Sequence, residues 1–170
     1  MDSVIRPKNY YYDLSQVKIA EIKASGTRPK LLLHSCCAPC NSYVMIMLSE
    51  VFDLTLLYNG SNIVPEAEYL IRSNELKHYT KSVNKQYNLN IQIKEFTYDT
   101  QTFHKELAKH DDGREGGQRC RACYKIRMRE AYQYALANDF DYFTTVMTIS
   151  RQKNSIILKM KDIISLHGTK

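Results

Sequence analysis

Five cysteines fall into two tight clusters along this chain instead of being scattered through it. Cys36, Cys37 and Cys40 lie within the stretch LLLHSCCAPCNSY, and Cys120 and Cys123 form a second pair. Isolated cysteines usually behave as small buried hydrophobic residues, whereas closely spaced clusters are typical of metal ligands and of thiol redox pairs. The residue types and their spacing therefore predict metal binding or redox chemistry.

The number of thiols bears on the kind of metal. A structural zinc site closes with four ligands and has no use for a fifth thiol, whereas a redox-active or open iron site does. The five cysteines therefore favour iron and leave zinc as the alternative metal. A third hypothesis, in which Cys37 and Cys40 exchange between dithiol and disulfide, leaves the other three cysteines unexplained.

Hydrophobic periodicity predicts strands that alternate with helices around both clusters. Buried strands are expected over residues 30–35, 53–59, 90–96 and 141–147. Helices are expected over residues 14–25 after an Asp13 cap, over 39–52, from Pro65 along an apolar stripe to Tyr87, over 101–109 and 120–138, and after a Ser150 cap. This alternation predicts an α/β fold in a single domain, with a mainly parallel sheet flanked by helices.

The predicted topology places both clusters at one edge of the sheet. Ligands of such sheets bind beyond the carboxyl ends of the strands, and Cys36 follows the first strand directly. Cys120 opens a helix after a glycine-rich loop, and a helix N-terminus favours the thiolate form that binds metals. We therefore expect the two clusters to meet, although they are far apart in the sequence.

Composition limits the classes of function. The chain has 170 residues, enough for one domain, and no stretch has the roughly 20 apolar residues that a membrane helix needs. The N-terminus lacks the apolar core of a signal peptide, so a cytoplasmic protein with no membrane partner is expected. The net charge of +6 favours an anionic partner, with nucleic acid first.

Four segments together resemble the cobalamin-independent epoxyqueuosine reductase family, often called QueH. They are RPKLLLHSCCAPCNSYV, NIVPEAEY, EGGQRCRACYKIRMREA and FDYFTTVMTISRQKN, and the likeness runs from about residue 9 to residue 154. The joint occurrence of CCxPC and EGGxRCxxC makes the resemblance specific. It implies a fold similar to the HUP-like (nucleotide α-hydrolase-like) group, in agreement with the α/β pattern.

The resemblance also implies an activity and a cofactor. Members reduce epoxyqueuosine to queuosine at the wobble position of tRNA, the last step of queuosine biosynthesis, and are described as iron–sulfur enzymes. Carried over by motif, Cys36, Cys37, Cys120 and Cys123 are the expected ligands of a [4Fe-4S] cluster, and Cys40 lies beside them, near the substrate or an additional iron. The expected partners are tRNA with a queuosine-type wobble base and an unidentified electron donor. The alternative is a zinc-stapled, non-catalytic nucleic-acid-binding module.

Two further groups of residues complete the expected site. Turning an epoxide into an alkene consumes two protons, so a proton donor is needed. The first candidates are Cys40 and Asp99, and His34 and His104 are further candidates. Basic residues around the second cysteine pair are candidates for binding tRNA phosphates, and the solvated face of a helix explains them equally well: Arg119, Arg121, Lys125 and Arg127.

The sequence departs from the family in two places. Relatives commonly continue further and carry a closely spaced cysteine pair near the C-terminus, thought to be redox-active, whereas this sequence ends at SLHGTK. Arg151 and Gln152 stand where relatives commonly have proline and histidine. We expect residues 1–28 to form an N-terminal helical extension and residues 29–170 an α/β metal-binding catalytic domain that lacks the family's C-terminal segment. Such a chain is expected to bind its metal and to turn over slowly.

Overall fold

The computed structural model describes residues 10–110, 114, 116–149 and 164–166. The helices are α1 Tyr10–Ser25, α2 Ala38–Ser49, α3 Glu66–Tyr87, α4 Thr100–Leu107 and α5 Gln118–Ala137, with a 3₁₀ helix η1 over Val146–Ile149. The strands are β1 Lys30–Ser35, β2 Asp53–Tyr58, β3 Gln92–Glu95, β4 Tyr142–Thr145 and β5 Ile164–Ser165. The four strands and five α-helices expected before Ser150 are thus confirmed, with shifts of a few residues at their ends.

The strands form one sheet in the order β3-β2-β1-β4-β5. The first four are parallel, and the short β5 pairs with β4 in the antiparallel direction. The central strand β1 is in register with β2 from Lys30 opposite Asp53 to Ser35 opposite Tyr58. This arrangement confirms the predicted α/β class with a mainly parallel sheet, and it is consistent with the HUP-like expectation.

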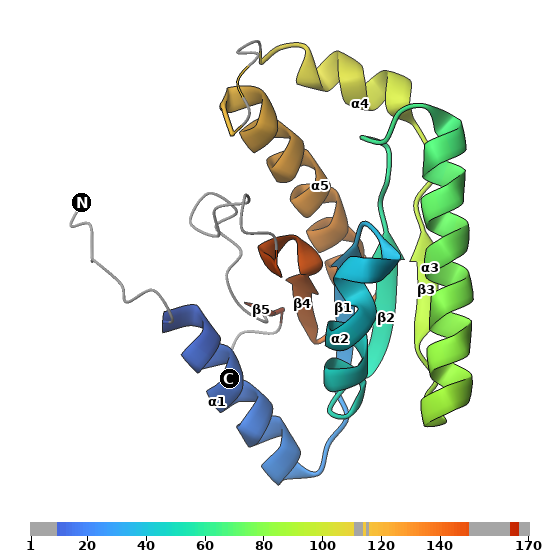
Figure 1. Ribbon diagram of the computed structural model, residues 1–170. Helices are drawn as coiled ribbons and strands as arrows, with labels where there is room; N and C mark the ends of the chain where they lie inside the picture. Colours follow the sequence, from blue (N-terminus) through green and yellow to red (C-terminus); the bar gives the residue numbers. More distant parts are fainter. Residues whose placement is uncertain (1–9, 111–113, 115, 150–163, 167–170) are drawn as a thin grey trace, which may run out of the picture.

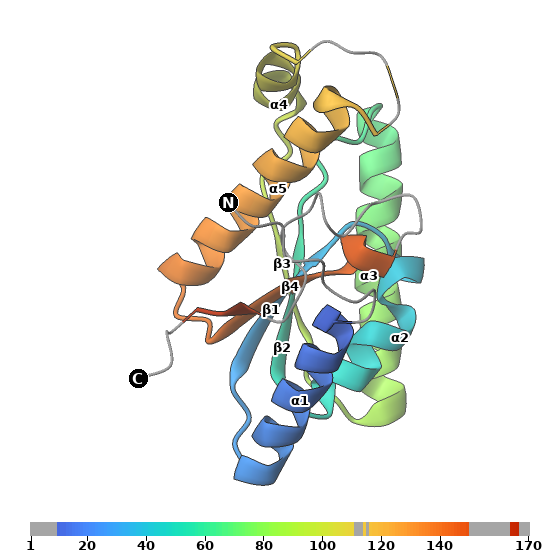
Figure 2. The ribbon, with the colours of Figure 1, turned by 90° about the vertical axis from the view of Figure 1, so that its left-hand side faces the viewer.

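Each face of the sheet carries its own hydrophobic core. Helices α1, α2 and α3 cover one face and α5 covers the other (Figure 1, Figure 2). Leu31 and Leu33 of β1 pack toward α2 and α3, whereas Leu32 between them packs with Met128 and Ala131 of α5. Successive strand residues point to opposite faces, so the unbroken apolar run of β1 is explained by burial on both sides.

Two local expectations were wrong in detail. Helix α1 begins at Tyr10, so Asp13 lies in its first turn and does not cap it. Tyr87 ends α3 with 48% of its surface exposed, because the buried stripe of α3 ends one turn earlier, at Val83. Gly26 does follow the last residue of α1, with the positive φ of +68° that favours glycine. The helix expected after Ser150, Arg151 and Gln152 lie outside the described residues.

The amino ends of the strands are closed by side-chain contacts to the backbone. The Arg28 guanidinium donates to the carbonyl oxygens of Ser49 and Phe52 at 2.7 and 3.0 Å and to that of Glu50 at 3.1 Å.

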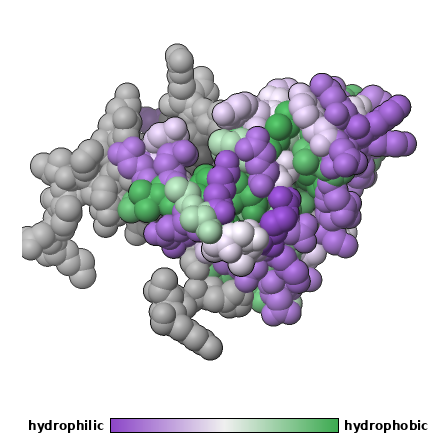
Figure 3. Space-filling view, turned by 90° about the horizontal axis from the view of Figure 1, so that it is seen from below, coloured by the Kyte–Doolittle hydropathy of each residue, from purple (hydrophilic) through white to green (hydrophobic). Residues whose placement is uncertain are grey.

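Figure 3 looks at the molecule from below, and it shows hydrophilic residues interleaved with small hydrophobic areas. In the described part of the chain, no helix combines the length and apolar character needed to cross a bilayer.

Candidate metal centre

The carboxyl ends of β1 and β4 mark the point where the chain changes its direction across the sheet. The chain adds β2 and β3 on one side of β1, and then adds β4 on the other. Loops that leave neighbouring strands toward opposite faces open a crevice at such a switch point, and ligands of α/β proteins bind there. Cys36 directly follows Ser35, the last residue of β1, and so lies at this switch point.

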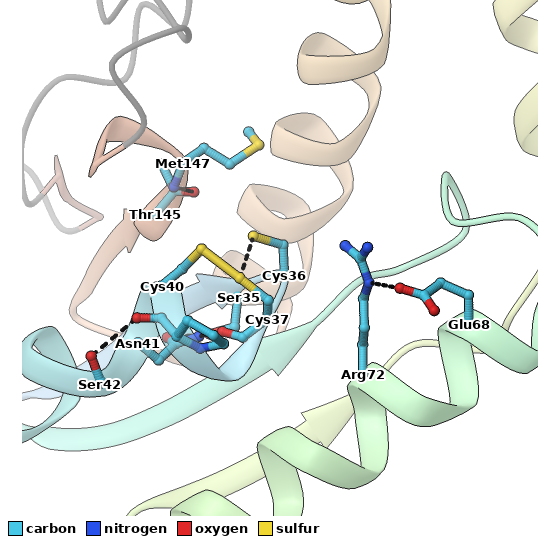
Figure 4. The surroundings of a disulfide bond; sticks show 11 residues. Ser35, Cys36, Cys37, Cys40, Asn41, Ser42, Glu68, Arg72, Thr145 and Met147 are labelled. Carbon is cyan, nitrogen blue, oxygen red and sulfur yellow. Dashed lines mark hydrogen bonds and ion pairs between the residues drawn. A yellow bond between two sulfur atoms is a disulfide. The ribbon is translucent and has the colours of Figure 1, made fainter.

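Three sulfur atoms gather where β1 turns into α2. The Sγ atoms of Cys36, Cys37 and Cys40 all lie within 4.8 Å of one another, and the three side chains are half-buried. Cys37 and Cys40 are joined as a disulfide, with Cα atoms 5.6 Å apart (Figure 4). The Cys36 thiol lies 3.8 Å from the Cys37 sulfur. The loop thus presents one disulfide and one thiol in direct contact.

The cysteine loop is fixed by a buried asparagine that the sequence analysis missed. The Asn41 amide donates to the Cys37 carbonyl oxygen at 2.6 Å, and its Oδ1 accepts from the Ser35 hydroxyl at 2.9 Å. Asn41 and Ser35 are both fully buried. Their contacts join the end of β1 to the first turn of α2 around the three sulfurs. The available signal was an asparagine inside an otherwise apolar helix, since a buried amide needs partners.

The donor set suits a soft metal. Thiolate sulfur is the ligand preferred by zinc and by iron–sulfur clusters, and three such donors already lie within 4.8 Å of one another. A sulfur in a disulfide is not a thiolate, so the Cys37–Cys40 bond must be reduced before all three residues can bind one metal. The residues therefore fit a thiolate-bound metal in the reduced state of the chain.

The second cysteine pair lies near the start of α5. Gly116, with φ of +77°, and Gly117, the N-cap, bring the chain into the helix, so α5 begins at Gln118, two residues before the predicted start. Cys120 and Cys123 are half-buried, and Cys123 packs against a small core under α4. Within the described residues, neither belongs to the group of sulfurs within 4.8 Å of one another. A single metal site with ligands from both pairs stays a prediction.

The second pair nevertheless shares a helix face with a residue that reaches the sheet edge. Positions 120, 123 and 127 follow the three- and four-residue spacing that places side chains on one side of a helix. Arg127 reaches from α5 to His34 of β1, with its Nη2 3.4 Å from His34 Nε2. Cys123 then lies about 6 Å, and Cys120 about 10 Å, further along the axis of α5.

Arg127 belongs to a buried polar network instead of a solvated helix face. Its side chain is 3% exposed, and Nη2 also donates to the Asn59 carbonyl oxygen at 3.3 Å. Because Arg127 donates to Nε2 of His34, the proton of this imidazole lies on Nδ1, 3.0 Å from the Thr145 hydroxyl. A contact to tRNA phosphates and a solvated helix face both need an exposed side chain, so both expectations from the sequence are wrong for Arg127. His34 is buried, with both ring nitrogens engaged.

Asp99 lies in a structural position, at the N-cap of α4. Its carboxylate accepts from the Thr102 backbone N–H at 2.9 Å, and this contact lowers the pKa of the exposed Asp99 carboxyl. Asp99 and Glu106 line a cavity of about 440 Å³ between α4 and α5. A carboxylate that is held ionised is a poor proton donor near neutral pH, so helix capping explains Asp99 better than catalysis. His104, on the same helix, packs edge-on against Phe103.

Two surfaces border the cysteines. Ala38 and Pro39, the residues between Cys37 and Cys40, line a cavity of about 730 Å³ that continues along α3 past Glu75 and His78. On α5, the other basic residues named from the sequence are exposed: Arg119, Arg121 and Lys125. The first surface gives a small molecule access to the loop between the two cysteines, and the second is a patch of positive charge beside the second pair.

Comparison with known proteins places this chain in one family. The family model "Epoxyqueuosine reductase QueH" matches residues 31–165. The chain is similar to the epoxyqueuosine reductases QueH of Staphylococcus aureus (34% identity over 145 residues, 82% of the chain) and Staphylococcus epidermidis (35% over 144 residues, 82%). It is also 34% identical over 163 residues, 88% of its length, to the QueH of Histophilus somni.

The matched residues 31–165 hold both cysteine clusters and the buried core apart from Ile22 of α1. The chain covers 59%, 60% and 65% of the lengths of these three relatives, which is roughly three fifths. The family model matches most of the chain, and these relatives are more than 30% identical to it. The chain therefore belongs to the epoxyqueuosine reductase QueH family.

Proposed function

We propose that this chain reduces epoxyqueuosine to queuosine in tRNA, at a metal centre held by its cysteines. The observation that carries the proposal is the convergence of Cys36, Cys37 and Cys40 at the switch point of the sheet, in a chain of the QueH family. The net charge of +6 is consistent with an RNA substrate.

The chemistry of the reaction sets what the site must supply. Conversion of an epoxide to an alkene takes two electrons and two protons, breaks both carbon–oxygen bonds and releases the oxygen as water. A thiolate-bound iron–sulfur centre, when present, supplies electrons one at a time at low potential, and an open iron would polarise the epoxide oxygen. The protein must hold the metal, deliver protons and bind the anticodon loop.

We assign the ligands and the proton donor to particular cysteines. Cys36 and Cys37, with Cys120 and Cys123, are the proposed ligands of a [4Fe-4S] cluster, and zinc is the alternative metal. Cys40 then has its thiol beside the metal and next to the cavity along α2 and α3, where it can donate a proton. Cys40 is a better candidate than Asp99, whose carboxylate caps α4 and is held ionised.

The remaining roles concern electrons and RNA. A dithiol or a protein electron donor must first reduce the Cys37–Cys40 bond, which takes two electrons and two protons and leaves two thiols. The cavity bordered by Ala38 and Pro39 is the proposed route of access for this reductant. Arg119, Arg121 and Lys125 are the proposed contacts to tRNA phosphates, since their side chains are exposed beside the second cysteine pair.

The decisive experiment is a single-turnover assay. The reduced chain is loaded with iron and sulfide without oxygen, reduced chemically, and mixed with tRNA that contains epoxyqueuosine. Mass spectrometry of the digested RNA is expected to show loss of one oxygen and formation of queuosine, because the only co-reactants needed are two electrons and two protons.

The Cys36→Ser variant is the matched negative control and is expected to give no conversion. Asp99→Asn tests the competing proton donor, and it is expected to convert tRNA at the rate of the unchanged chain. A chain with an intact iron centre that converts no epoxyqueuosine would contradict the proposal. A chain that takes up zinc but no iron, and that binds RNA, would favour the non-catalytic module.

A further inference from the structure

Arg127 is a buried cation at the same edge of the sheet as the cysteine cluster. Only 3% of its surface is exposed, although an arginine is rarely buried without a partner of opposite charge. The guanidinium contacts neutral groups, the Asn59 carbonyl oxygen at 3.3 Å and the His34 imidazole at 3.4 Å. Its Nε is buried without a hydrogen-bond partner among the described residues.

Acidic side chains in the neighbourhood are directed to other partners. Glu130, one turn further along α5, accepts from the Asn59 amide at 2.9 Å. Arg72 on α3, whose side chain lies in the surroundings of the cysteines, forms an ion pair with Glu68 at 2.6 Å (Figure 4). In the described part of the chain, no carboxylate lies within 4.0 Å of the Arg127 guanidinium. Arg127 therefore differs from Arg72 in having no anionic partner.

A buried charge of this kind is costly. Removing a guanidinium from water carries a desolvation penalty that hydrogen bonds to neutral groups offset only in part. The two hydrogen bonds that Arg127 makes are long, since 3.3 and 3.4 Å exceed the usual range for N–H donors. The arrangement thus lacks a negative charge that would stabilise it.

The thiolates of the cysteine cluster are the source of negative charge at this edge of the sheet. Burial is the main reason that the pKa of Tyr58 rises to about 12. Arg72 and Glu95 have smaller effects of opposite sign, and a thiolate at Cys36 and the Arg127 guanidinium follow, also with opposite sign. Cys36 and Arg127 therefore lie within electrostatic reach of the same side chain. Thiols lose their protons when they bind a metal, so the four proposed thiolate ligands around a divalent ion leave a net charge of −2.

We infer that Arg127 is the counter-charge of the metal centre, a positioning residue that compensates the negative charge of the cysteine thiolates once they hold a metal. The inference rests on the proposed function only in that Cys36 and Cys37 are among the thiolates that bind a metal. Arg127 acts across the sheet edge, through space and through His34, which precedes Ser35 and Cys36 on β1. It touches neither substrate nor metal in this role.

The test uses Co²⁺ as the probe. The chain is treated with a phosphine reductant to open the Cys37–Cys40 bond, and Co²⁺ is titrated anaerobically while the thiolate-to-metal absorption is followed. Arg127→Gln is expected to raise the Kd for Co²⁺ roughly tenfold, the effect of one buried unit charge in a medium of intermediate dielectric. Arg127→Lys keeps the charge and is expected to retain most of the affinity. Arg129→Gln, an exposed change on the same helix, is the matched control.

The stability of the metal-free chain separates this role from a structural one. Without metal, Arg127→Gln is expected to unfold at the same or a higher denaturant concentration, because a buried uncompensated cation is removed. Equal Co²⁺ affinity in the unchanged chain and in Arg127→Gln would overturn the inference. So would a loss of affinity in Arg127→Lys as large as in Arg127→Gln. Absence of Co²⁺ binding in the unchanged chain would instead show that the proposed metal site itself is wrong.

Discussion

The two cysteine clusters differ in how much of the fold is needed to assemble them. Cys36, Cys37 and Cys40 lie on one strand-to-helix loop, and their sulfurs are within 4.8 Å of one another. Cys120 and Cys123 lie on α5, on the other face of the sheet from α2 (Figure 2). The first cluster is local in sequence, whereas any meeting of the second with the first depends on how α5 packs against β1.

The difference indicates that the position of the first cluster and the position of the second are fixed by different contacts. The Asn41 and Ser35 contacts fix the first loop regardless of α5. The position of α5 is set by Met128, Ala131 and Ala135, which pack on Leu32 and Phe143 of the sheet. A metal that uses ligands from both clusters would therefore also tie α5 to β1, in addition to the contact between Arg127 and His34.

The largest expected effect comes from removing one sulfur from each cluster. If both clusters hold one metal, Cys37→Ser and Cys123→Ser will each lose most of the iron, because a four-ligand centre without one thiolate is unstable. Iron per chain, measured after anaerobic reconstitution, checks the expectation. Ser42→Ala, which leaves every thiol in place, is the control.

The outcomes of this pair of variants distinguish the two arrangements. Loss of iron in Cys37→Ser together with full retention in Cys123→Ser would show that the first cluster alone holds the metal. Cys123 would then be a packing residue of the small core under α4, where its side chain lies among Phe103, Leu107 and Ile126. Full retention in both variants would contradict the metal site in either form.

A second comparison concerns the basic residues of α5. Arg121 and Lys125 are exposed, whereas Arg127 is buried. Changing both Arg121 and Lys125 to Ala is expected to weaken tRNA binding and to flatten the salt dependence of binding, by about one log–log unit for each lost phosphate contact. Filter binding over a series of salt concentrations measures the slope. Lys85→Ala, at the far end of α3, is expected to leave the slope unchanged.

An unchanged slope in the Arg121 and Lys125 double variant would place the RNA surface away from α5. The two residues would then be the solvated face that the sequence alone left open. Arg127 is not expected to affect the slope, because its guanidinium is covered by α5 and by the ends of β1 and β2.

Much of the fold followed from the sequence, for physical reasons that particular residues show. The apolar run of β1 and the alternation of strands with helices predicted the parallel sheet, because burial on both faces leaves an unambiguous pattern. The start of α1 was not predicted, because Asp13 is as acceptable in the first turn of a helix as at its N-cap. Tyr87 was misplaced because a periodic stripe does not show where the partner surface ends.

The candidate site followed from the sequence only in part. Spacing alone placed Cys36, Cys37 and Cys40 together, since residues on one tight turn are neighbours in any fold. The burial of Arg127 was not predicted, because the basic residues around it, Arg121 and Lys125, resemble a solvated helix face. The role of Asp99 as a cap was likewise missed, because the contact with Thr102 is defined by the exact start of α4.

The smallest expected effect tests whether the packing of α3 against the sheet is independent of the metal centre. Glu95, at the end of β3, accepts from the Tyr69 hydroxyl at 2.6 Å and the Ser73 hydroxyl at 2.7 Å, and it pairs with Lys77. Burial alone would raise the pKa of Glu95, but the hydrogen bonds from Lys77, Tyr69 and Ser73 lower it below its ordinary value of 4.5. The ionised carboxylate thus fastens α3 to the sheet.

A carboxyl whose pKa is lower in the folded chain stabilises the fold above the pKa of the unfolded chain. This stabilisation is lost as the pH falls below about 4.5 and through the lower folded value. Glu95→Gln is therefore expected to reduce the free energy of unfolding by about 1 kcal/mol near neutral pH, a value discounted for partial solvent screening, and to flatten its decline in acid. Urea unfolding at a series of pH values measures both effects.

Iron content near neutral pH is expected to stay unchanged, because Glu95 fastens α3 to β3 and makes no contact with the cysteine loop. If Glu95→Gln lost as much iron as Cys37→Ser, the first cluster would not be fixed by its own loop. Both clusters would then depend on the packing of the whole fold, and the difference between them would disappear.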